Sequence, residues 1–74
     1  MKPEYAAVVD KLETDGKPIV AQRGGMAPEM FRDVIAFART SRNLSELEYS
    51  IREIHSFIKQ CKDGIAARKG EDND

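Results

Sequence analysis

The chain of 74 residues has little of what small proteins use to stabilise a fold. It contains one cysteine, Cys61, and one histidine, His55. One cysteine cannot form an internal disulfide, and the pair falls short of the four ligands of a structural zinc site. A chain this short buries only a modest core, so good helix packing or self-association has to supply the remaining stability. We therefore expect one small domain over residues 1–69 that forms a homo-oligomer, most simply a homodimer.

Long apolar runs and an excess of one charge are also missing. No apolar run approaches the roughly 20 residues that cross a membrane, so no membrane partner is expected. The chain has 12 Lys and Arg against 13 Asp and Glu, which removes the simplest argument for a nucleic-acid partner. Glu4 stands where an export signal would begin its apolar segment, and a single free cysteine is typical of a reducing compartment. We expect a cytoplasmic location.

Helical spacing of apolar residues predicts an all-α fold. Pro3 suits the first position of a helix, and residues 5–12 repeat with a helical period. Asp15-Gly16 predicts that this short helix stops there, followed by an extended linker over residues 17–26. The alternative is a β-hairpin turning at the same dipeptide, with residues 19–21 as the return strand. Whether residues 17–25 form a strand or a loop stays open at this point.

A second helix is predicted from Pro28 to about Thr40. Its apolar residues occupy one broad arc, wide enough to contact two neighbouring helices. These residues are Met30, Phe31, Val34, Ile35, Phe37 and Ala38.

The strongest pattern lies between residues 44 and 65, where apolar residues alternate at intervals of 3 and 4. This heptad pattern predicts a long third helix, which we expect to form an antiparallel helical hairpin with the second. The seam either forms the core of one chain or also pairs with a second copy, and the second alternative is favoured. The candidate self-association residues are Leu47, Ile51, Ile54, Phe57, Ile58, Cys61 and Ile65. Residues 70–74 are predicted to be a disordered acidic tail.

Catalysis has no visible basis. His55 and Cys61 lie six residues apart, so on a helix they point about 120° away from each other and do not form a shared site. We expect a boundary residue at His55, a buried and inert thiol at Cys61, no enzyme activity and no cofactor or metal.

Two surfaces are candidates for binding. Arginine is enriched in protein interfaces, and Arg32 and Arg39 point the same way on the second helix. The predicted partner-binding set is Arg23, Arg32, Arg39 and Arg42. A weaker prediction is an anion site at Lys17, Arg23, Gly24 and Gly25, because a helix N-terminus attracts anions.

These patterns indicate a small non-enzymatic regulator that binds another protein, such as an inhibitor or adaptor, of a kind encoded by phages and mobile elements. One alternative is a DNA-binding regulator that uses the arginines. It is less favoured because Glu46 and Glu48 would repel phosphate at the start of the third helix. A second alternative is an oligomer that sequesters an anionic ligand or nucleotide at the Gly24-Gly25 turn.

Overall fold

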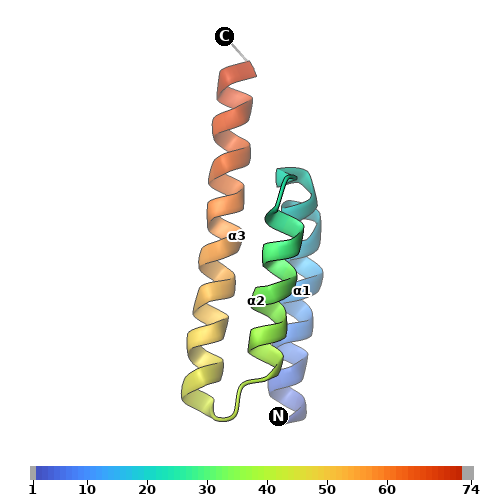
Figure 1. Cartoon of the computed structure of the whole chain (residues 1–74), viewed down its shortest axis with the longest axis vertical. Helices are drawn as coiled ribbons and strands as arrows, with labels where there is room; N and C mark the ends of the chain where they lie inside the picture. Colours follow the sequence, from blue (N-terminus) through green and yellow to red (C-terminus); the bar gives the residue numbers. More distant parts are fainter. Residues whose placement is uncertain (1, 73–74) are drawn as a thin grey trace.

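Three helices form an up-down-up bundle (Figure 1). The computed structural model describes residues 2–72, with α1 over Pro3–Arg23, α2 over Ala27–Arg39 and α3 over Leu44–Asp72. α1 and α3 run in one direction and α2 runs in the opposite direction, and each helix packs against the other two. The all-α prediction is confirmed, since no strand occurs within residues 2–72. α3 is the longest helix, and its C-terminal part projects past the turn that joins α1 to α2.

One apolar core runs along the bundle and receives side chains from all three helices. Phe31 lies near its centre, with its ring centroid 6.0 Å from that of the half-buried Phe57. The stacked rings stabilise the packing of α2 on α3. The buried apolar residues are Val9, Val20, Ala27, Phe31, Ile35, Ala38, Leu47, Ile54 and Cys61.

The first helix is longer than the sequence predicts. α1 continues through Gly16 and Pro18, so the short first helix and the extended linker are wrong for residues 17–23, and the alternative β-hairpin is wrong as well. Proline inside a helix typically costs about 3 kcal/mol because it removes a backbone hydrogen bond. Val20, which follows Pro18, is only 2% exposed. Burying the apolar side of this last part of α1 outweighs the local stop signal.

At Gly16, α1 lies close against the other two helices. A Cβ built on this residue would lie 2.7 Å from Cζ of Phe31 and 2.9 Å from Cδ1 of Ile58. Both distances are shorter than ordinary van der Waals contact. The glycine that seemed to end the helix instead lets α1 lie close against α2 and α3.

The turn between α1 and α2 is made by Gly24 and Gly25, whose φ angles are 74° and 60°. Side chains other than glycine rarely adopt these angles, so this dipeptide, and not Gly16, ends the first helix. The Gly24 amide donates to the carbonyl of Val20 over 3.1 Å. Arg68 reaches back from α3 and donates from Nη2 to the carbonyl oxygen of Arg23 over 3.3 Å. The end of α1 is therefore capped both locally and by α3.

The start of α3 is fixed by a pair of side-chain hydrogen bonds. The Glu46 amide donates to Oδ1 of Asn43 over 2.9 Å, and the Arg42 amide donates to Oε2 of Glu46 over 2.7 Å. Asn43 therefore caps the first turn of α3, and Glu46 reaches back to the residue before it, in a variant of the capping box. The helix runs to Asp72, so the segment expected as a tail begins inside α3. The side chains of residues 70–72 and all of residues 73–74 lie outside the described part of the chain.

Candidate functional site

The heptad seam of α3 is largely used inside the chain. Leu47, Ile54 and Cys61 are 2%, 0% and 4% exposed and belong to the core. The other candidates for self-association, Ile51, Phe57, Ile58 and Ile65, are half-buried. Only this second group therefore retains surface that a further molecule could contact.

The four candidate arginines do not form one patch. Arg23 lies at the end of α1, next to the α1–α2 turn, and Arg42 lies in the α2–α3 turn at the opposite end of the bundle. Arg23 and Arg42 therefore do not meet, and the four arginines are spread along the length of the bundle. An up-down-up topology places successive turns at opposite ends.

Arg39 is engaged within the chain. Its Nη2 atom lies 2.7 Å from Oδ1 of Asp10 and 2.9 Å from Oε1 of Glu13, both on α1. The hydrogen bond to Asp10 is the main reason that the pKa of Arg39 is raised. Exposed ion pairs of this kind typically contribute up to about 1 kcal/mol. Arg32 lines a hollow beside Glu13 and Lys17, so both arginines of α2 face the α1 side.

The turn that was considered as an anion site offers few amides. Pro28 has no N–H, the Ala27 amide donates to the carbonyl of Gly24, and the Met30 amide donates to that of Met26. Glu29 adds a negative charge to the first turn of α2. Lys17 lies on α1 and lines a different hollow from the one beside Arg23 and Gly24. The four residues predicted for this site are not brought together.

The most distinctive surface is an apolar groove between α2 and α3, on the side away from α1. Met26, Met30 and Phe37 are 64%, 51% and 58% exposed, although other apolar residues of α2, such as Phe31 and Ile35, are buried in the core. With the half-buried Val34 they follow at intervals of four, four and three residues, and therefore form one row along the helix. Tyr49, 57% exposed, faces this row from α3. We call this surface the α2–α3 groove.

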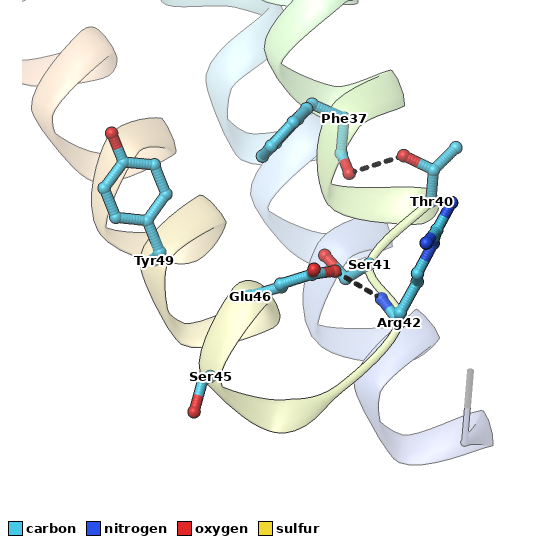
Figure 2. Close-up of a pocket in the computed structure, with 7 residues that line it drawn as sticks. All are labelled: Phe37, Thr40, Ser41, Arg42, Ser45, Glu46 and Tyr49. Atoms are coloured by element: carbon cyan, nitrogen blue, oxygen red, sulfur yellow. Dashed lines mark hydrogen bonds between the residues drawn. The ribbon is translucent and has the colours of Figure 1, made fainter.

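Each end of the α2–α3 groove is hollowed. Near the α2–α3 turn a cavity of about 510 Å³ is lined by Phe37, Ser41, Arg42, Glu46 and Tyr49, among others. Figure 2 shows Phe37 and Tyr49 on opposite sides of this hollow, one from each helix. At the other end a cavity of about 420 Å³ lies among Met26, Met30 and Phe57. Large, exposed aromatic and methionine side chains around two hollows are typical of a protein-binding surface.

The flanks of this groove are acidic. Glu29 and Asp33 lie beside the apolar row of α2, one helical turn apart, and Glu46 and Glu53 lie on the facing side of α3; all four are exposed. The arginines near the groove, Arg23 and Arg42, lie at its two ends and not along its flanks. A ligand in the groove therefore meets an apolar floor between carboxylates.

The groove was only partly visible in the sequence. The wide apolar arc of residues 30–38 suggested contact with two neighbours, but periodicity does not separate a residue facing a second helix from one facing solvent. Met26 and Tyr49 lie outside the predicted arc. Their role appears only when α2 and α3 lie side by side.

The structure brings together no catalytic arrangement at the two residues considered for chemistry. Cys61 is buried and His55 is exposed. Burial raises the pKa of the Cys61 thiol, which the charge of Arg23 lowers by less. Among the described side chains, those of residues 2–69, no group of three from His, Cys, Asp or Glu is placed to hold a metal ion. No helix within residues 2–72 is long and apolar enough to cross a membrane.

Comparison with known proteins gives no match to a family model, to a curated protein or to a solved structure.

Proposed function

We propose that the chain is a non-enzymatic protein-binding regulator, an inhibitor or adaptor of a larger protein, that acts as a homodimer and holds its partner in the α2–α3 groove. The observation that carries this proposal is the exposure of Met26, Met30, Phe37 and Tyr49 along one face. Burying such side chains against a partner provides the largest available gain in free energy, at about 25 cal/mol per Å² of apolar surface.

The groove suits an amphipathic helix. It runs parallel to two helices, and its apolar row repeats at helical intervals, which is how grooves that receive a helix are built. The carboxylates of Asp33 and Glu53 beside the row favour a helix whose apolar face is bordered by Lys or Arg. A second copy of the chain fits this groove poorly, because a two-fold contact here would bring the same carboxylates together.

The experiment that tests this proposal uses a photo-crosslinking amino acid placed at single positions. Phe37 and Tyr49 lie in the groove, whereas Arg52 is exposed on the outer side of α3. In a lysate of the native host, we expect the first two positions to label the same protein and Arg52 to label it weakly or not at all. Equal labelling from all three positions would contradict the proposal.

Affinity for the labelled protein then gives the energetic test. Phe37→Ser and Tyr49→Ser should each weaken binding by more than tenfold, about 1.4 kcal/mol. Arg52→Glu is the matched control and should leave affinity within about twofold. Circular dichroism verifies that the variants keep their helices, which is expected because both aromatic side chains are more than half exposed. Unchanged affinity in both groove variants would place the binding surface elsewhere.

A further inference from the structure

The face between α1 and α3 is a second, separate apolar surface. On α3, Ile51, Ile58 and Ile65 are half-buried, and Leu44 in the same row is 50% exposed. On α1, Val8 is 43% exposed beside the half-buried Leu12 and Ile19. These residues lie on the opposite side of α3 from the α2–α3 groove, so a partner in that groove leaves them uncovered.

Two opposite charges lie beside this row, at equal distances along α3 from His55. Glu48, His55 and Lys62 are spaced by seven residues and are all exposed. A spacing of seven places them in one line along α3, next to the isoleucine row. The line therefore has a carboxylate at one end, an ammonium group at the other and His55 midway.

We propose that a second copy of the chain docks antiparallel on this α1–α3 face, about a two-fold axis close to His55. Glu48 then lies opposite Lys62 of the second copy, and Lys62 lies opposite Glu48 of the second copy. The same axis brings Ile51 opposite Ile58 and Leu44 opposite Ile65. A two-fold interface requires such self-complementarity, because each contact occurs twice.

A hollow on this face can receive Leu44 of the second copy, at the end of the interface. It has a volume of about 260 Å³ and is lined by Ile19, Lys62, Ile65 and Lys69, among others. The antiparallel arrangement places the exposed Leu44 of the second copy over this hollow. Covering Leu44 and Ile65 together removes apolar surface from water at both ends of the interface.

The charges also select the orientation. A parallel pair in register would place Glu48 against Glu48 and Lys62 against Lys62, and like charges in contact oppose association. The antiparallel pair converts both contacts into opposite-charge pairs. This inference specifies the homodimer of the proposed function, but it uses a different surface, so that either can fail alone.

Sedimentation of charge-reversal variants tests the interface. We expect a dimer at micromolar concentration, and a more than tenfold weaker association in Glu48→Lys and in Lys62→Glu, since each change creates two like-charge contacts. The combination of both changes restores the pairs and should recover association to within about threefold of the original. Arg52→Glu, on the outer side of α3, is the matched control and should change little.

Orientation is tested by crosslinking. Glu48→Cys and Lys62→Cys chains, each carrying Cys61→Ala, should form a mixed disulfide when combined and little disulfide when each is oxidised alone. A stable monomer at high micromolar concentration overturns the inference. So does a dimer that is insensitive to both reversals, or one that joins position 48 to position 48. If Phe37→Ser weakens the dimer and Lys62→Glu does not, the inference is also overturned. That result would show that the two copies meet at the α2–α3 groove.

Discussion

Replacing Gly16 with alanine adds one methyl group at a position where α1 lies close against α2 and α3. The added carbon would lie 2.7 Å from Cζ of Phe31 and 2.9 Å from Cδ1 of Ile58. Phe31 is 4% exposed and its ring packs against that of Phe57, which limits how far it can shift. Two opposing effects decide the result. Alanine favours the helix over glycine by about 1 kcal/mol, and overpacking a core typically costs about 1–3 kcal/mol.

Overpacking is the larger effect at this position, so Gly16→Ala should lower the free energy of unfolding by about 1 kcal/mol. Gly64→Ala is the matched control. Its Cβ would lie 2.5 Å from Nε of Arg23, but this atom belongs to a long, flexible side chain that can shift. The helix preference should therefore prevail there and stabilise the protein by up to about 1 kcal/mol. The two substitutions are chemically identical and have opposite expected signs.

Thermal and urea unfolding followed by circular dichroism measure both effects. A difference of about 2 kcal/mol between the variants corresponds to roughly 8–16 °C in Tm for a domain of this size. Protein concentration has to be held constant, because dimerisation stabilises the folded state by mass action. If Gly16→Ala is as stable as Gly64→Ala, the close approach of α1 to Phe31 is not a tight contact, and the reasoning is refuted.

Two further outcomes concern buried polar groups. The Ser50 hydroxyl is fully buried without a hydrogen-bond partner, so Ser50→Ala should raise unfolding free energy by about 1 kcal/mol, more than exposed Ser56→Ala does. If both substitutions raise the unfolding free energy equally, the gain reflects only the higher helix propensity of alanine. Because burial raises the pKa of the Cys61 thiol, this group favours folding below the pKa of the unfolded chain, about 8.5, and its contribution is lost as pH rises through the folded-state pKa. Urea unfolding at several alkaline pH values should show a steeper loss than in Cys61→Ala, and parallel curves would contradict this.

The sequence predicted the parts of the fold that depend on local chemistry. The predicted long third helix begins at Leu44, where the apolar pattern begins, and Pro28 falls in the first turn of α2, as expected. The end of α1 was predicted wrongly because local rules treat Asp15-Gly16 and Pro18 as a stop. Their effect is reversed by contacts with α2 and α3, which lie far along the chain and have no local signature.

The candidate site was harder to predict for the same reason. The arginines were identified as binding residues from their residue type, but the role of Arg39 depends on Asp10 and Glu13, which only the packing of α1 on α2 brings near. The heptad pattern correctly marked residues that pack, such as Ile54, but periodicity does not distinguish a partner helix in the same chain from one in another. The exposure of Phe37 and Tyr49 depends on which helices pack beside them, and the sequence pattern does not show this.

The hydrogen bond from Arg68 to the carbonyl of Arg23 joins residues 45 positions apart. During synthesis, Arg23 is added to the chain 45 residues before Arg68. The last turn of α1 lies between Pro18 and the two glycines that follow the helix, so it is the part of the helix least able to form alone. Contacts this distant in sequence form late, because the intervening chain has to be ordered first. The end of the first helix to be made is therefore expected to be among the last parts of the molecule to become ordered, and until then the α1–α2 turn remains open to proteases and chaperones.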